Sequence, residues 1–170
     1  MPQWLFQREL EALVGREVFY LDECGVEHRL YHEYGRAPRG ERIYAEVAGG
    51  QRQSTSIISV SQNSKLVAPF VFEGSCNTEV VDTYFEKVLL PALPKGSVIV
   101  LDNASFHQSP STQKLVADAG CELLFLPTYS PDLNPIEHLW AKLKAALRRI
   151  LPDSKNPTLS ISNMCKCYAS

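Results

Sequence analysis

The sequence lacks a long hydrophobic run. No stretch approaches the roughly 20 apolar residues that a membrane-spanning helix needs, and charged residues come too early at the N-terminus for a secretory signal peptide. Hydrophobic residues make up 45% and charged residues 21% of the 170 positions, which is typical of one globular domain with a real core. We therefore expect a cytoplasmic protein with no membrane segment.

A disulfide framework is missing as well. The five cysteines are an odd number at irregular spacing, so we expect reduced thiols. Cys165 and Cys167 are one residue apart, and they lack both the two-residue gap and the second pair of a zinc site.

There is no excess of positive charge. The 17 lysines and arginines face 19 acidic residues, which gives a net charge of −2 and a pI of about 6.1. A free-standing DNA-binding protein is usually basic, so this balance counts against tight DNA binding by the chain alone. An acidic metal site would itself subtract several charges, however, and local basic clusters can still grip phosphate.

The pattern of apolar residues predicts an α/β fold. The expected elements are a helix over 3–14, strands over 18–22, 28–32, 54–61 and 66–72, a turn over 23–27, a helix from 78 that stops before 91, a strand over 97–101, a helix over 110–119, a strand over 121–126 and a helix from 135 to about 150. An antiparallel meander followed by strand–helix alternation implies a mixed sheet flanked by helices. Residues 151–170 show no clear period, so we expect a loosely attached tail after a domain over 1–150.

Three carboxylates stand at the ends of expected core elements. Asp22 and Asp102 each follow a buried strand, and Glu137 lies at the mouth of the last helix. Sites in open α/β sheets form at the carboxyl ends of strands, and neighbouring carboxylates repel unless a cation lies between them. Hard oxygen ligands select Mg²⁺ or Mn²⁺ over zinc. Two such ions can activate a water or a 3′-hydroxyl for in-line displacement at phosphorus.

Glu137 also has a purely structural interpretation. Asn134, Pro135 and Glu137 form a capping-box pattern, with proline at the first helical position. The two interpretations are compatible, because a carboxylate in the first helical turn is held ionised by the helix dipole, and a metal ligand must be ionised. Asn134 would then position the metal ligand Glu137 without contacting the metal itself.

The loop after Asp102 holds further candidates. His107 is either a structural histidine or a residue near the phosphate or in a proton relay. Asn103 either orients a metal ligand or a water, or makes a local turn bond. Ser105 has no histidine–acid support nearby, so no serine or cysteine nucleophile is expected.

Two basic groups are candidates for DNA contacts. Arg36, Arg39 and Arg42 lie in the irregular segment 33–53, which is either a solvated loop or an arm that contacts phosphate with guanidinium groups. Lys144 and Arg148 follow Glu137 along one helical face. They form either a track for a phosphate backbone or a solvated helix end favoured by the dipole.

Three segments of the sequence form a recognisable set. They are Leu21-Asp-Glu23, Val100-Leu-Asp-Asn-Ala-Ser-Phe-His107 and Leu126-Pro-Thr-Tyr-Ser-Pro-Asp-Leu-Asn-Pro-Ile-Glu-His-Leu-Trp140, the last followed by Lys142 and Lys144. Together they resemble the catalytic domain of DDE transposases, most closely the bacterial insertion-sequence members of the mariner superfamily, and Arg36–Gly40 and Phe72–Ser75 are weaker matches. Thirty-four residues, 103–136, separate Asp102 from Glu137, as in the DD34E arrangement. The resemblance covers about residues 3–150.

The resemblance implies a ribonuclease-H-like fold with a five-stranded mixed sheet, three antiparallel strands then two parallel ones. It implies Asp22, Asp102 and Glu137 as ligands of two Mg²⁺ ions. It also implies cleavage of transposon ends, joining of the 3′-hydroxyl to target DNA, and action as a dimer or higher oligomer. Such a protein would work in the bacterial cytoplasm, associated with the nucleoid when bound to DNA.

One family feature is absent from this sequence. Family members carry N-terminal helix-turn-helix DNA-binding domains, whereas this sequence begins almost at the catalytic domain. We expect recognition of the transposon ends to need a separately encoded helix-turn-helix polypeptide. The alternatives are a catalytically idle remnant that dimerises or regulates a transposase, and another ribonuclease-H-like metal-dependent nuclease.

Overall fold

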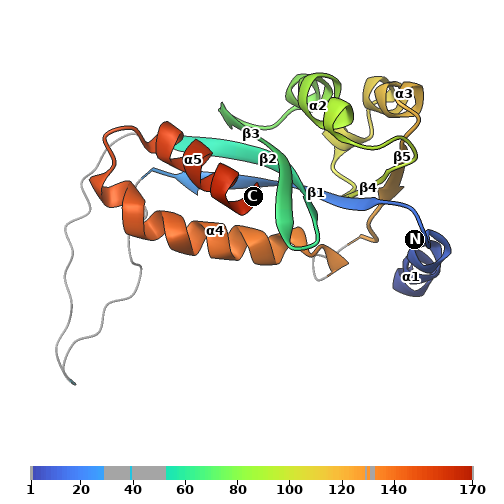
Figure 1. Cartoon of the computed structure of the whole chain (residues 1–170), viewed down its shortest axis with the longest axis horizontal. Coiled ribbons are helices and arrows are strands. Elements are labelled where there is room, and N and C mark those ends of the chain that lie inside the picture. The colour runs from blue at the N-terminus through green and yellow to red at the C-terminus, as the bar shows by residue number, and fades with distance from the viewer. Residues whose placement is uncertain (1, 29–38, 40–52, 129, 131–132, 170) are drawn as a thin grey trace.

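A mixed five-stranded sheet forms the centre of the protein, in the order β3-β2-β1-β4-β5 (Figure 1). The computed structural model describes residues 2–28, 39, 53–128, 130 and 133–169. The strands are β1 Val18–Glu27, β2 Ser54–Gln62, β3 Lys65–Glu73, β4 Val98–Leu101 and β5 Glu122–Phe125. β1, β2 and β3 pair antiparallel, while β1, β4 and β5 pair parallel, which confirms the predicted sheet.

Helices cover both faces of this sheet. They are α1 Gln3–Ala12, α2 Thr78–Tyr84, α3 Pro110–Asp118, α4 Ile136–Ile150 and α5 Pro157–Ala169, with short helical turns η1 Phe85–Leu89, η2 Leu90–Ala92, η3 Ser105–His107 and η5 Leu151–Asp153. α2 and α3 lie on one face, and α4 and α5 lie on the other (Figure 1). Within the described part of the chain, no helix is long and apolar enough to cross a membrane.

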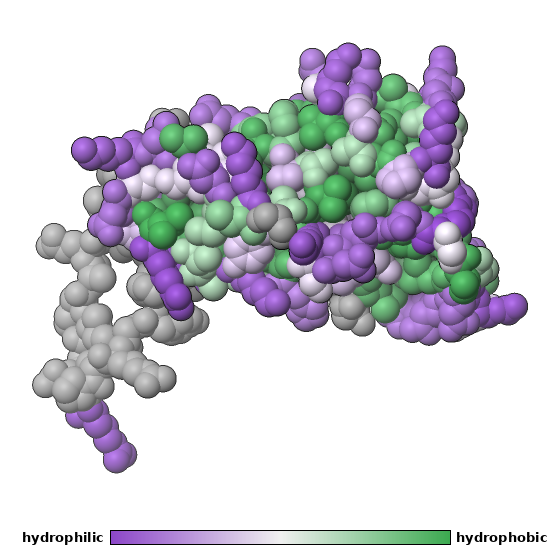
Figure 2. Space-filling view, in the orientation of Figure 1, coloured by the Kyte–Doolittle hydropathy of each residue, from purple (hydrophilic) through white to green (hydrophobic). Residues whose placement is uncertain are grey.

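The two faces of β1 contribute to separate hydrophobic clusters. Phe19 and Leu21 pack with α2 and η1, whereas Cys24 and Val26 pack with α4 and α5. Successive strand side chains point to opposite faces, so the apolar residues of β1 are divided between the two clusters. Figure 2 shows apolar residues gathered below α2 in the middle of the visible face, with hydrophilic residues around its margins. β1 is therefore the central strand of the sheet and contributes to the core on both of its faces.

Helix α4 lies against the sheet along one apolar stripe. Its buried residues recur at the three- and four-residue spacing of a helix face, as the sequence predicts; they are Ile136, Leu139, Trp140, Leu143 and Leu147. This burial fixes the rotation of α4 about its axis. The same rotation brings the first turn of the helix to the centre of the sheet.

The sequence-based boundaries of β1 are wrong. The strand does not stop at Asp22, and the turn expected over 23–27 is strand. β2 pairs with β1 as far as Glu27↔Ser54, so hydrogen bonding from β2 extends the strand through the glycine and the charged residues. Of the second strand expected over 28–32, only His28 lies within the described residues, and it adopts a bend.

The interpretation of residues 151–170 as a loosely attached tail is also corrected. Residues 157–169 form α5, which packs against β3 and α4. Ile161 and Cys165, one helical turn apart, are buried in the same cluster as the α4 stripe. This buried stripe is narrow and interrupted by serine and asparagine, so the period of the helix is weak in the sequence.

Candidate active site

Asp22, Asp102 and Glu137 line one cavity of about 360 Å³. The strand register explains the first two: Tyr20 pairs in parallel with Val100, and each aspartate comes two residues after its member of that pair. Asp102 directly follows the end of β4, whereas Asp22 lies within β1, beyond the last residue that pairs with β4. Glu137 reaches the same cavity from the first turn of α4.

The other walls of this cavity come from two connections. One is the segment after β4, and the other is the segment that leads from β5 to α4. The lining residues from these segments are Asn103, Ala104, Leu126, Pro127, Thr128, Ser130 and Asn134. The polar side chains among them carry hydroxyl or amide groups; these are Asn103, Thr128, Ser130 and Asn134.

Asp22 is the most buried of the three acids. Its Oδ2 accepts a hydrogen bond from Trp140 Nε1 at 3.0 Å. Burial, followed by the negative charges of Glu23 and Glu137, raises the pKa of Asp22 from its ordinary value to about 7. A cation in the cavity would offset this repulsion, so the electrostatics of the site favour a bound positive charge.

Asp102 has the opposite electrostatic environment. Its side chain is 55% exposed, and its Oδ1 accepts hydrogen bonds from Ala104 N at 3.0 Å and from His107 Nδ1 at 2.7 Å. The hydrogen bond from His107 is the main reason why the pKa of Asp102 lies below its ordinary value. Asp102 is therefore ionised wherever the protein is folded near neutral pH.

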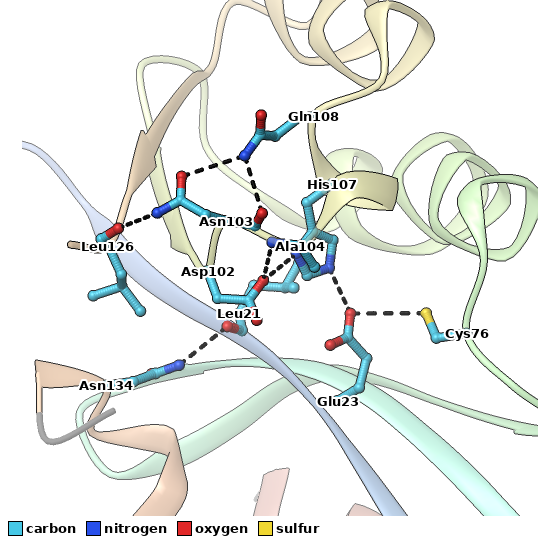
Figure 3. Close-up of polar contacts among 10 residues, drawn as sticks. All are labelled: Leu21, Glu23, Cys76, Asp102, Asn103, Ala104, His107, Gln108, Leu126 and Asn134. Carbon is cyan, nitrogen blue, oxygen red and sulfur yellow. Dashed lines mark hydrogen bonds and ion pairs between the residues drawn. The ribbon is translucent and has the colours of Figure 1, made fainter. Parts of the chain in front are cut away.

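His107 lies behind Asp102 and outside the set of residues that line the cavity (Figure 3). It is buried on η3, and its Nε2 lies 2.6 Å from Glu23 Oε1. Burial alone would lower the pKa of His107, but the hydrogen bonds to Asp102 and Glu23 prevail and raise it to about 9. The imidazolium ring thus bridges two carboxylates.

Asn103 and Asn134 each tie one wall of the cavity to a neighbouring strand. Asn103 Nδ2 donates to the Leu126 carbonyl, which joins the loop after β4 to the end of β5 (Figure 3). Asn134 is buried, and its Nδ2 donates to the Leu21 carbonyl at 3.3 Å while its Oδ1 accepts from Ile136 N at 3.4 Å. Both asparagines therefore position backbone that carries an acid of the site.

The capping-box prediction is met only in part. The Glu137 backbone N donates to the Asn134 carbonyl at 3.2 Å, and α4 begins at Ile136. In the portion of the chain that the structure describes, the Glu137 carboxylate does not accept a hydrogen bond from Asn134 N. Glu137 is exposed at the cavity, so its carboxylate remains open to a ligand.

The predicted DNA-contacting residues lie in different surroundings. Arg148 is exposed on α4, whereas Lys144 is half-buried beside Cys24, and its charge partly offsets the rise that burial causes in the pKa of that thiol. Arg39 is exposed in a turn. Arg36 and Arg42 lie outside the described residues.

The donor set fits a hard divalent cation. Carboxylate oxygens are the ligands that Mg²⁺ and Mn²⁺ prefer, and three of them line this cavity. Over the described ranges, no three His, Cys, Asp or Glu side chains gather closely enough around one point to hold a metal ion. The support for a divalent cation here therefore comes from the chemistry of the lining oxygens.

A family model described as "DDE superfamily endonuclease" matches residues 17–157, which include all three acids. The chain belongs to the DDE superfamily endonucleases. Its relatives include the Tc1 transposase of Caenorhabditis elegans, 31% identical over 55% of this chain and 33% of that protein. They also include the insertion element IS630 uncharacterized 39 kDa protein of Shigella sonnei, 27% identical over 76% of this chain and 41% of that protein. The chain therefore spans less than half the length of these two relatives.

Solved structures show the same fold. The catalytic domain of Mos1 mariner transposase superposes with a TM-score of 0.67 at 16% identity, over 99% of this chain and 77% of that one. The Mos1 transposase paired-end complex with left transposon end gives a TM-score of 0.69 at 15% identity, over 98% of this chain and 58% of that one. The ribonuclease-H-like architecture expected of a DDE superfamily endonuclease is thereby confirmed.

The sequence interpretation of this DDE superfamily endonuclease misses two residues that hold the acids. It places Glu23 in a turn, although a position next to Asp22 in a strand would put Glu23 on the opposite face. It names Trp140 only as the last residue of the segment that resembles the family and gives it no role in the site. Because Trp140 is three residues from Glu137, helical spacing brings its indole near the same end of the helix.

Proposed function

We propose that this chain is the catalytic domain of a transposase that cleaves DNA at transposon ends and joins them to target DNA in a reaction that depends on divalent metal ions. The observation that carries this proposal is the single cavity shared by Asp22, Asp102 and Glu137. The proposal is also supported by the family to which the chain belongs and by the carboxylate oxygens that line the cavity.

In this proposal the three acids are the metal ligands, and two neighbouring side chains position them. Asp22, Asp102 and Glu137 would hold two Mg²⁺ or Mn²⁺ ions, which supply activation of the attacking hydroxyl and stabilisation of the leaving oxygen. Trp140 orients the carboxylate of Asp22, and Asn134 fixes the start of α4 against β1. The choice of metals is supported by solved structures of the Mos1 transposase catalytic domain and raltegravir, one with Mg and one with Mn.

DNA is the proposed substrate and partner. Two of the Mos1 structures are paired-end complexes, one of them with the left transposon end. By analogy, this chain would act as a dimer or higher oligomer on two ends in the bacterial cytoplasm. Arg36, Arg39, Arg42, Lys144 and Arg148 are the proposed phosphate contacts. DNA-binding proteins are usually basic, and this chain has a net charge of −2. We therefore propose that a helix-turn-helix segment or polypeptide recognises the sequence of the transposon end.

The decisive experiment measures nicking of a labelled DNA duplex that carries the terminal repeats flanking this gene, with Mn²⁺ or with EDTA. We expect slow nicking by the wild type in Mn²⁺ and none in EDTA. Removing a partner that only orients a metal ligand typically costs about 10- to 100-fold, so Asp102→Ala, which removes a proposed ligand, should lose roughly 100-fold or more. Asp118→Ala, which removes an exposed carboxylate at the end of α3, serves as the matched control and should nick at the wild-type rate. Equal nicking by the wild type and Asp102→Ala would contradict the proposed site.

A further inference from the structure

We infer that Glu23 is a positioning residue of this active site, which acts on Asp102 through His107. The inference rests on the proposed function, because the orientation of Asp102 matters to the reaction only if Asp102 holds an ion. Glu23 itself is outside the set of residues that line the cavity. Its role is therefore distinct from that of its chain neighbour Asp22.

β1 supplies one carboxylate to each face of the sheet. Asp22 points toward α4, where Trp140 donates to it, and Glu23 points to the opposite face, where it meets His107. This alternation follows from the two-residue period of a strand. The Asp–Glu pair in β1 thus contacts the site from both sides.

Two short contacts connect Glu23 to Asp102. Glu23 Oε1 lies 2.6 Å from His107 Nε2, and His107 Nδ1 lies 2.7 Å from Asp102 Oδ1 (Figure 3). The imidazole ring is a rigid spacer, so the two contacts set the distance between β1 and the Asp102 carboxylate. The second oxygen, Oδ2, is not used by either this bond or the one from Ala104 N. It is the oxygen left for a ligand.

The surroundings hold the ring of His107 in this orientation. The side chain of His107 is only 1% exposed, and the ring of Phe106 meets it edge-on with centroids 4.6 Å apart. The Cys76 thiol lies 3.8 Å from Glu23 Oε1. Mainly because the thiol is buried, its pKa is raised to about 12, so it stays protonated and can donate a hydrogen bond to Glu23. Glu23 is consequently held from two directions.

Asp102 needs such a restraint. It follows the last residue of β4, and its side chain is 55% exposed, so no packing of its own fixes the carboxylate. Partners that orient metal ligands typically change metal affinity by about 10- to 100-fold when they are removed. The hydrogen bonds from Glu23 through His107 to Asp102 therefore position a proposed metal ligand, in addition to any contribution that they make to folding.

The first test measures Mn²⁺ affinity by calorimetry on the whole chain without DNA. We expect Glu23→Ala to weaken binding about 10- to 100-fold. Glu23→Gln retains an oxygen that can accept from His107 Nε2, so its affinity should stay within about threefold of the wild type. Glu73→Ala, at the exposed end of β3, is the matched control and should not change the affinity.

Two outcomes of this titration would overturn the inference. One is wild-type affinity in Glu23→Ala, and the other is a loss in Glu23→Gln as large as that in Glu23→Ala. The second outcome would mean that the charge of Glu23, rather than the hydrogen bond that it accepts, sets the affinity.

The second test needs no metal and separates this inference from the proposed function. Proton–nitrogen NMR of the wild type should show a slowly exchanging Nε2–H signal from His107, assigned by its loss in His107→Gln. The signal should persist in Glu23→Gln and disappear in Glu23→Ala. A wild-type protein without this signal would overturn the inference, even if Glu23→Ala did not fold. A wild type that shows the signal but binds no Mn²⁺ would contradict the proposed metal site instead.

Discussion

The indole Nε1 of Trp140 donates a hydrogen bond to Asp22 Oδ2 at 3.0 Å, and this bond joins the acid of the central strand to the helix that carries Glu137. Trp140 is buried at 3% exposure in the α4 stripe, so its ring is held by packing while its nitrogen reaches the cavity wall. The bond joins two residues that are 118 positions apart in the sequence. It thereby links the strand of Asp22 to the helix of Glu137.

Replacing Trp140 with phenylalanine should separate packing from orientation. The ring remains apolar, but the donor to Asp22 is lost, so we expect the nicking rate and Mn²⁺ affinity to fall about 10-fold or more. Trp4→Phe, which changes an indole that is 59% exposed on α1, is the matched control and should leave both unchanged. Unaltered Mn²⁺ affinity in a folded Trp140→Phe protein would contradict this role.

Asp22 should reduce the stability of the metal-free protein as pH rises. Burial and the charges of Glu23 and Glu137 raise its pKa from 3.8 to about 7. The folded state therefore binds the proton more tightly than the unfolded state, and this contribution to stability is present below about pH 4 and lost as pH rises through about 7.

We expect Asp22→Asn to raise the free energy of unfolding by up to about 4 kcal/mol at about pH 8 in EDTA, since about three pKa units correspond to that free energy, and to have little effect at about pH 4. Urea titrations at both pH values measure the difference. A stabilisation of equal size at both would show that charge at position 22 is not its cause.

Helix α5 should be part of the cooperative fold. Ile161 is fully buried against the α4 stripe, so Ile161→Ala should lower the free energy of unfolding by about 2–5 kcal/mol. Leu159→Ala, two residues earlier and 55% exposed, should change it by less than about 0.5 kcal/mol. Similar small effects in both variants would contradict this prediction and would indicate that α5 is only loosely attached.

Arg148 should contribute to DNA binding through phosphate alone. It is exposed on α4, the helix that begins with Glu137 at the cavity. Arg148→Gln should weaken binding to DNA duplexes of any sequence and reduce the slope of log K against log salt by about one. Lys87→Gln, which removes a cation already paired with Glu86 on η1, should leave the slope unchanged. An unchanged slope in Arg148→Gln would show that Arg148 does not contact the DNA phosphates.

The sequence by itself was enough to predict β4 and α4 and to propose three candidate acids next to the predicted elements. β4 is an unbroken apolar run, so Asp102 marks its end directly, and the apolar period of α4 places Glu137 in the first turn. These features depend on residues near one another in the chain. Residue type and spacing are enough to define them.

Only the tertiary structure decided how these elements meet. β1 runs past Asp22 because β2, from residues 54–62, pairs with it, and no local pattern around Asp22 contains that partner. The contact from Glu23 to His107 spans 84 residues, and α5 gains its helix from burial against α4 and β3. Hydrogen bonding and burial between distant segments outweigh local propensity at these positions. The candidate acids can therefore be proposed from the sequence, while the side chains that contact them become visible only in the folded chain.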